Sequence, residues 1–417
     1  MPDNAAALFT VLFLLALAVA TGLRLWLALR QMRHVQAHRS QVPTEFAASF
    51  SLADHQKAAD YTLAKGRVGL IDLAIDTLML LAFTLGGLLQ WFDAAWREVF
   101  TSGYSQGLAL FASMGLVGFV VGLPLTLYRT FVIEARFGFN KMTPALFIAD
   151  LAKSTLLTVL IGAPLLLAVL WLMDAMGGRW WLYVWLLWLG FNLLVLLLYP
   201  TLIAPLFNKF SPLPDGPLKD RIEALLARCG FGSAGLFVMD GSKRSAHGNA
   251  YFTGFGKGRR IVFFDTLIDK LTPGEIESVL AHELGHYKLR HIWKRLGLMA
   301  ALSLGFLWLL GQVIDAPWFY QGLGVAQPGT AMALILFSLV LPVFLFPLAP
   351  LTSGLSRQHE FEADAYAAQQ ASGTDLVAAL TKLYRDNAAT LTPDPLHSLF
   401  YDSHPPAAIR VARLRTA

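Results

Sequence analysis

His282, Glu283 and His286 form an HExxH motif, written HELGH in this chain. The TPGE stretch at residues 272–275 has the pattern of a helix capping box with proline at the first helical position, so we expect the motif to lie on a helix. Residues four apart share one face of a helix, and both imidazoles can therefore point at one metal ion. Glu283 would lie beside that ion, where it can take a proton from a bound water. The pattern predicts a catalytic zinc site, and the alternative is a helix that carries these residues by chance.

A catalytic zinc ion usually has three protein ligands and one open position, so the two histidines need a third partner. The segment SRQHEFEADAYA, residues 356–367, offers Glu360 and Asp364, which are four residues apart. Glu360 can ligate the metal, and Asp364, one helical turn later, can accept the free ring N–H of a ligating histidine. The same spacing also fits an amphipathic helix with a solvated acidic face. Glu362 points away from Glu360 on such a helix, so we expect it to be solvated.

Together, HELGH and SRQHEFEADAYA resemble the peptidase family that contains the type I CAAX prenyl endopeptidases and the HtpX-type heat-shock membrane proteases. Further segments are similar to the CAAX protease branch: RTFVIE at residues 129–134, GFNK at 138–141, HGNAYFTG at 247–254 and SHPP at 403–406. The likeness covers nearly the whole chain. HtpX-type proteins are similar only over the catalytic part and are considerably shorter.

The resemblance implies roles for individual residues of this chain. Glu360 corresponds to the family's third zinc ligand, and Asp364 to the aspartate that bonds a ligating histidine. His404 corresponds to the group that stabilises the oxyanion, and Arg410 to a residue that holds the substrate or the surroundings of Glu283. From the sequence alone, a histidine before two prolines is only a surface-loop residue.

Asn249 and Ala250 begin a short apolar run that we predict to be a strand of a small antiparallel sheet, together with residues 236–239 and 260–264. If this strand lies at the sheet edge, it can bind an extended peptide by strand addition and bring a carbonyl to the metal. We therefore expect both residues to contact the substrate. The remaining histidines near the motifs are expected to be structural or solvated: His247, His291, His359 and His397.

The composition is that of a membrane protein, with 56% hydrophobic residues, 15% charged residues and a mean hydropathy of +0.54. No basic run is interleaved with aromatic residues, so the sequence has no nucleic-acid-binding footprint. The single cysteine, Cys229, excludes an intramolecular disulfide. The predicted partners are membrane lipids and a peptide or protein substrate, lipidated or membrane-embedded, and no obligate protein partner is evident.

Seven apolar stretches are long enough to cross a bilayer, which takes about 20 helical residues. Their approximate limits are 6–29, 68–91, 104–128, 155–176, 180–204, 297–320 and 329–352. The predicted fold class is mostly α, a seven-span helical membrane protein with a small α+β zinc-peptidase domain, which the resemblance implies is gluzincin-like. The HExxH helix runs almost directly into the sixth stretch and Glu360 follows the seventh, so the zinc site must lie close to, or within, the membrane boundary.

Four regions follow from this order. They are an N-terminal membrane region of five spans, a first catalytic segment, a transmembrane hairpin and a last catalytic segment with the third ligand, with limits 1–206, 207–295, 296–353 and 354–417. Asp72 and Asp76 lie inside the second span, where a charge is costly. We expect them to face the bundle interior or a water-filled space, or to pair with a basic side chain.

Basic residues are concentrated in the first, third and fifth loops, whereas the second and fourth loops have one arginine each and the sixth has none. The positive-inside rule therefore puts the catalytic domain and the C-terminus in the cytoplasm and the N-terminus outside. The Leu- and Ala-rich chain, without a dilysine-type signal at its C-terminus, favours a bacterial cytoplasmic membrane.

The favoured function is an integral-membrane zinc endopeptidase of the CAAX-protease type that cuts near the membrane surface. One alternative is a quality-control protease like the HtpX class, which cuts misfolded membrane proteins. Another is a non-catalytic carrier with a structural zinc ion. A structural site would more often use cysteines, and Cys229 is the only one in the chain.

Overall fold

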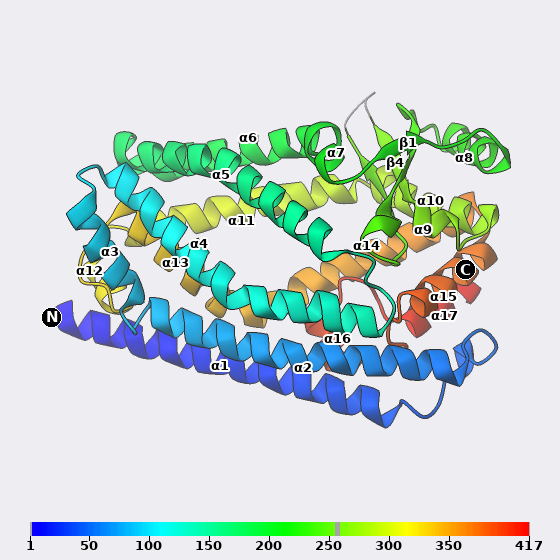
Figure 1. Ribbon diagram of the computed structural model, residues 1–417, viewed down its shortest axis with the longest axis horizontal. Coiled ribbons are helices and arrows are strands. Elements are labelled where there is room, and N and C mark those ends of the chain that lie inside the picture. The colour runs from blue at the N-terminus through cyan, green and yellow to red at the C-terminus, as the bar shows by residue number, and fades with distance from the viewer. Residues whose placement is uncertain (1, 255–258, 417) are drawn as a thin grey trace.

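The computed structural model describes residues 2–254 and 259–416 and is mostly helical (Figure 1). Long helices form a bundle, and a sheet with shorter helices gathers at one end, which we call the compact end. The bundle contains α1 (Pro2–Ala37), α2 (Leu52–Phe83), α3 (Leu88–Val99), α4 (Gly103–Tyr128), α5 (Pro144–Ala175), α6 (Trp180–Leu198), α7 (Ala204–Phe207), α11 (His291–Val313), α12 (Pro317–Gln321) and α13 (Thr330–Leu345). The compact end contains α8 (Pro217–Arg228), α9 (Asp265–Ile268), α10 (Pro273–Lys288), α14 (Ala349–Gln370), α15 (Gly373–Asp386), α16 (Pro395–Tyr401) and α17 (Ala407–Thr416).

Within the described residues, six helices are long and apolar enough to cross a membrane, or up to seven if the bent pair α2–α3 counts as one span. Large apolar side chains on these helices are exposed, as expected where lipid covers them; Leu78, for example, is 65% exposed. The predicted span at residues 68–91 is not one straight helix, because the chain bends by 48° between α2 and α3. Gly87 has a φ of +76° at this break, a backbone conformation that glycine adopts without strain.

Asp72 and Asp76 of α2 both line a cavity of about 400 Å³ between α1, α2, α4 and α13. Asp72 also forms an ion pair with Arg129, which begins the π-helical turn after α4. The expectation that these charges avoid lipid is met for both residues, and the alternative of a basic partner also holds for Asp72.

The sheet contains four strands in the order β1 (Phe210–Pro212), β2 (Leu236–Met239), β4 (Arg260–Phe264) and β3 (Ala250–Thr253). The prediction of an antiparallel sheet was wrong for one pair, because β2 and β4 are parallel. The chain crosses from β2 to the far edge, where it forms β3, and then returns between them as β4, antiparallel to β3. The described part of the sheet therefore pairs β3 on one side only, as the edge-strand hypothesis requires.

Helix α10 begins where the sequence predicts. Thr272 Oγ1 accepts a hydrogen bond from Glu275 N, and Glu275 Oε2 accepts one from Thr272 N at 2.8 Å, which completes the capping box. Ile276, Leu280 and Leu284 recur every four residues and are at most 1% exposed, so this apolar stripe faces the core of the compact end.

Helices α10 and α14 approach closely at Gly285. A Cβ atom added to this glycine would lie 3.0 Å from the Cα atom of Ala363, a tight contact that would push the two backbones slightly apart. Because α11 and α13 come between α10 and α14 in the chain, this contact brings together the two catalytic segments that the transmembrane hairpin separates.

The first and third loops lie against the compact end. Phe46 and Phe50 of the first loop pack with Leu391 and Val411. In the third loop, Lys141 N donates to the carbonyl of Arg244 at 3.1 Å. The loops that the basic-residue pattern assigns to one side of the membrane therefore meet at one end of the molecule, away from the N-terminus (Figure 1).

Candidate metal centre

Three potential metal ligands converge between α10 and α14. Nε2 of His282 lies 3.2 Å from Nε2 of His286. Glu360 reaches across from α14, with Oε1 3.2 Å from Nε2 of His286 and Oε2 3.5 Å from Nε2 of His282. One ligand atom from each residue lies within 4.8 Å of the other two, so a single ion can be held by all three.

The surroundings of these atoms fit a metal ion. Glu360 Oε2 is buried and accepts no hydrogen bond from the described residues. Both imidazoles turn a nitrogen toward the same carboxylate, and a cation between them would satisfy all three groups. Two histidines and one glutamate are a ligand set of catalytic zinc sites, in which the fourth position is open.

Asp364 and Arg410 support the ligand His282 from behind. Nδ1 of His282 lies 2.8 Å from Oδ1 of Asp364. The Arg410 guanidinium is buried and donates two hydrogen bonds to this carboxylate, from Nε at 2.8 Å and from an Nη at 2.6 Å. The family resemblance implied that Arg410 binds substrate or holds the surroundings of Glu283. Arg410 lines the same cleft as Glu283, two of its nitrogens are bonded to Asp364, and the third lies 3.6 Å from Oε2 of Glu360. Its observed contact is with the metal-site scaffold, because a bidentate pair holds the carboxylate in one orientation.

The charges around His282 oppose the effect of its burial. Burial alone would lower the pKa of His282, but the carboxylates of Asp364 and Glu360 outweigh it and raise this pKa to about 9. Burial likewise opposes protonation of Arg410, yet pairing with Asp364 raises the pKa of Arg410. A proton on His282 therefore occupies the position that a metal ion would take, and metal binding must displace it.

A cleft of about 370 Å³ opens beside the metal ligands, and Glu283 and His404 both line it. Glu283 is half-buried. The side chain of His404 is 62% exposed, and its Nε2 lies 3.5 Å from Glu360 Oε1. The structure thus brings the predicted base and the predicted oxyanion-stabilising residue to the same opening as the metal ligands.

The cleft is also lined by Asn249 and Ala250, at the start of the edge strand β3. The carbonyl of Asn249 accepts a hydrogen bond from Phe264 N at 3.0 Å, and its Oδ1 accepts one from Ala250 N at 2.8 Å. These bonds hold the start of β3 against β4. The position of both residues at the cleft agrees with the prediction, while their contact with substrate stays a prediction.

Matches to known proteins cover almost the whole chain. A family model described as CAAX prenyl protease N-terminal, five membrane helices, matches residues 31–209, and that of peptidase family M48 matches residues 212–417. A CAAX prenyl protease 1 homolog of Arabidopsis thaliana is 36% identical over 406 residues, which cover 93% of this chain and 92% of that protein. The human CAAX prenyl protease 1 homolog is 32% identical over 440 residues, which cover 94% of this chain and 92% of that protein. The crystal structure of S. mikatae Ste24p matches 99% of both chains, with a TM-score of 0.88 and 30% identity.

The chain belongs to the CAAX prenyl protease family. It is a multi-pass membrane protein with a small peptidase domain, as the sequence predicted, and its enzyme class is that of a metalloendopeptidase. The sequence resemblance to the CAAX-protease branch is confirmed by relatives that match over almost their entire length.

The sequence did not predict one wall of the cleft in this CAAX protease family member. Its apolar wall comprises Leu267, Val279, Leu376, Leu380 and Leu383. The last three are spaced as one face of α15, which predicts a buried helix face. Nothing in that spacing indicates that the face borders the metal ligands, since α15 reaches them only through its packing on α10.

His291 and Glu362 both lie near the candidate ligands: the burial of His291 fits the structural alternative predicted for it, and the Glu362 side chain is 34% exposed. His291 was expected to be structural or solvated, and Glu362 to be solvated. His291 is only 2% exposed, and its Nδ1 lies 3.0 Å from Nδ1 of the ligand His286. Its Nε2 lies 2.9 Å from Oε2 of Glu362. The available signal was the third histidine of HELGHYKLRH, five residues after His286.

Proposed function

We propose that this protein is a zinc-dependent endopeptidase that cleaves prenylated CAAX-type substrates at the membrane surface. The observation that carries the proposal is the convergence of His282, His286 and Glu360 beside a cleft that Glu283 lines. Relatives named CAAX prenyl proteases support the substrate class. The two histidines and the glutamate would hold one zinc ion per chain.

Zinc at this position supplies a Lewis acid that polarises a peptide carbonyl and makes water more acidic. Glu283 would take the proton from the attacking water and deliver it to the leaving amine nitrogen, as a general base and then a general acid. His404 would donate a hydrogen bond from Nε2 to the oxyanion that forms on the substrate carbonyl. Its exposed position at the cleft is suited to contact with a substrate rather than to packing.

Substrate would bind as an added strand. The free edge of β3 can pair with an extended peptide, which would then run past Asn249 and Ala250 toward the metal ligands. The apolar wall of the cleft suits the aliphatic residues of a CAAX motif. Arg410 can add to substrate binding only through a nitrogen that Asp364 does not occupy, so its main effect would be on the metal site.

The proposal is tested with the purified full-length protein in detergent or lipid nanodiscs. A farnesylated CAAX peptide should be cut, removal of zinc by a chelator should abolish cutting, and added zinc should restore it. The same peptide without the isoprenoid is the matched substrate control and should be cut more slowly. Chelator-insensitive cutting would contradict the zinc mechanism. Equal cutting of both peptides and of an unfolded membrane protein would instead favour the HtpX-like quality-control function.

We propose further that the compact end faces the cytoplasm and the N-terminus faces the opposite side, because basic residues are concentrated in the loops that meet there. A bacterial cytoplasmic membrane remains our prediction for the location. Labelling of intact cells with an impermeant thiol reagent tests the orientation. A cysteine at Ser102 should react and one at Ser211 should not, and the reverse pattern would overturn the assignment.

The four-region division of the chain is part of the same proposal. The segments 207–295 and 354–417 would form one catalytic unit, with the hairpin 296–353 between them. Its support is the close contact of α10 with α14, which joins the ligands of the two segments.

A further inference from the structure

The ligand His286 has a second ring nitrogen that does not face the metal position. This nitrogen, Nδ1, lies 3.0 Å from Nδ1 of His291. The other nitrogen of His291 lies 2.9 Å from Oε2 of Glu362. His286, His291 and Glu362 therefore form a continuous row from the metal position to the outer face of α14.

The donors and acceptors in this row can be arranged in only one way when a metal is held. Nε2 of His286 must offer its lone pair to the ion, so its proton is on Nδ1, and Nδ1 must donate. Nδ1 of His291 must then accept, which puts the proton of His291 on Nε2. A carboxylate only accepts, and Glu362 is therefore the right group to receive that proton.

We propose that His291 and Glu362 are positioning residues that fix the tautomer and the ring orientation of His286. The inference rests on the zinc site proposed above. With this pair, each histidine ligand has a partner for the ring nitrogen that faces away from the metal position: His282 has Asp364, held by Arg410, and His286 has His291, held by Glu362. A ligating histidine whose other nitrogen is held in this way binds metal more tightly than one that is free to rotate.

The surrounding structure holds the pair in place. Arg290 has a φ of +60°, which ends α10 and turns the first residue of α11, His291, back toward His286. The His291 ring stacks on His359, with centroids 4.1 Å apart and an interplanar angle of 11°. Gln358 Nε2 donates to Oε1 of Glu362 at 3.0 Å and leaves Oε2 for His291. The row thus joins three structural elements, namely the ends of α10 and α11 and the middle of α14.

A plain packing function is the competing explanation, because His291 is buried and stacked. Two substitutions of His291 distinguish the explanations, because positioning and packing predict opposite orders of zinc affinity for the two variants. His291→Asn keeps an acceptor oxygen near the position of Nδ1 but leaves a gap beside His359. His291→Phe fills the gap and keeps the stack but offers no acceptor to His286. Positioning predicts that the asparagine variant binds zinc more tightly, and packing predicts the same of the phenylalanine variant.

The measurement is zinc affinity of the purified full-length protein by competition with a chromophoric chelator, together with thermal unfolding of the metal-free protein. We expect His291→Phe to bind zinc about 10–100-fold more weakly than the unmodified protein, with a smaller loss for His291→Asn. Glu362→Gln should give a smaller loss of the same kind, because it removes the charge but not every acceptor.

Matched controls exist in the chain. His397→Phe makes the same replacement in a half-buried histidine that stacks on Tyr401 and has no ligand contact. Glu277→Gln removes a buried carboxylate of α10 that pairs with Arg221 and Arg228, away from the metal ligands. Both controls should keep the affinity of the unmodified protein, even where their unfolding temperature falls.

Failure of the inference is distinguishable from failure of the zinc proposal. If the unmodified protein binds zinc and Asp364→Asn weakens it, but His291→Phe and Glu362→Gln do not, the positioning pair is refuted and the zinc site stands. Tighter binding by His291→Phe than by His291→Asn would also refute it. If the unmodified protein binds no zinc, the metal centre itself is refuted. Should His291→Phe not fold, Glu362→Gln against Glu277→Gln decides the question.

Discussion

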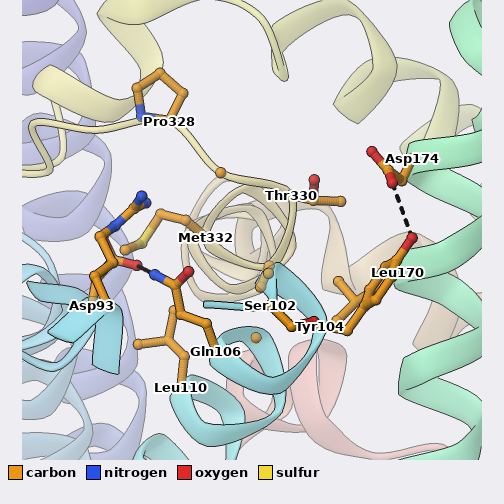
Figure 2. Close-up of a pocket in the computed structure, with 15 residues that line it drawn as sticks. Asp93, Ser102, Tyr104, Gln106, Leu110, Leu170, Asp174, Pro328, Thr330 and Met332 are labelled. Carbon is orange, nitrogen blue, oxygen red and sulfur yellow. Dashed lines mark hydrogen bonds and ion pairs between the residues drawn. The ribbon is translucent and has the colours of Figure 1, made fainter. Parts of the chain in front are cut away.

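Two cavities of similar size lie at opposite ends of this molecule. The cleft beside the metal ligands measures about 370 Å³, and an outer pocket between α3, α4, α5 and the start of α13 measures about 410 Å³ (Figure 2). Each is lined by a buried carboxylate, Asp93 in the outer pocket and Glu360 in the cleft. They differ in whether those carboxylates already have all their partners within the protein.

In the outer pocket the acids are satisfied. Asp93 accepts hydrogen bonds from Arg97 Nε and Gln106 Nε2, both at 2.8 Å, and Asp174 accepts one from the Tyr104 hydroxyl at 2.9 Å. In the metal cleft, Oε2 of Glu360 is buried and receives no hydrogen bond from the described residues, although Nε2 of His282 and an Nη of Arg410 lie 3.5 Å and 3.6 Å away. Size therefore does not distinguish the two cavities, whereas the hydrogen bonding of their buried carboxylates does.

Loss of the third ligand should give the largest effect. Glu360→Ala removes the only carboxylate of the ligand set, so zinc content and peptidase activity should both fall close to background. Elemental analysis and peptide cleavage measure the two. Asp93→Asn, at a buried acid of the outer pocket, is the control and should keep its zinc. Equal zinc loss in both variants would erase the distinction between the two cavities.

Loss of the proposed base should come next. Glu283→Gln keeps the shape of the side chain and the metal ligands but cannot accept a proton. Zinc should be retained, and activity should fall by about 10²–10⁴-fold. The same two assays measure this result. Activity within a few-fold of the unmodified enzyme would remove Glu283 from the mechanism.

Each cavity has an arginine at its lining that pairs with an aspartate, Arg410 with Asp364 and Arg97 with Asp93. Comparing these two pairs gives a finer test. Arg410→Lys keeps the charge beside Asp364 but cannot form the bidentate pair, so the His282 ring loses part of its support. Zinc affinity or activity should fall by about 10–100-fold. Arg97→Lys makes the same change beside Asp93 and should leave both within a few-fold. A comparable loss in Arg97→Lys would mean that global stability, not ligand support, explains the effect.

The smallest expected effect concerns two tightly packed glycines. A Cβ at Gly285 would press on the backbone of α14, whereas one at Gly107 would meet the Leu170 Cδ1 and Ala331 Cβ atoms. Gly285→Ala should therefore destabilise the fold by about 1–3 kcal/mol and weaken zinc binding. Gly107→Ala should lower the unfolding temperature without a change in zinc affinity, because it is remote from Glu360. Thermal unfolding with and without zinc separates the two, and an unchanged zinc affinity in Gly285→Ala would be the contrary result.

Local features of the site followed from the sequence. The cap at Thr272, the helix over HELGH and the shared face of His282 and His286 depend on neighbours within a few residues, and helical geometry alone relates them. The third ligand, Glu360, was reachable by its spacing to Asp364 together with the family resemblance. Apolar length likewise indicated the spans, although the bend after Phe83 depends on the backbone at Gly87 and was not foreseen.

Long-range partners did not follow from the sequence. Arg410 lies 46 residues from Asp364, and Glu362 lies 71 residues from His291, so no helical period connects either pair. The parallel pairing of β2 with β4 is of the same kind, because it results from where β3 joins the sheet. Glu362 was expected to be solvated and its side chain is 34% exposed, but its contact with His291 could not be read from its direction relative to Glu360 on one helix.

The sequence by itself determined that this is a membrane metalloprotease with two candidate ligands on one helix, because residue type and helical spacing already indicate that chemistry. The tertiary structure decided which carboxylates complete and support the site. The close contact of α10 and α14 at Gly285 brings Glu360 and Asp364 to the two histidines of the motif and Glu362 to His291. One of these acids then faces the candidate metal position, and the other two lie behind the histidines. Such a division depends on the relative position of two helices that are separated in the chain by a transmembrane hairpin.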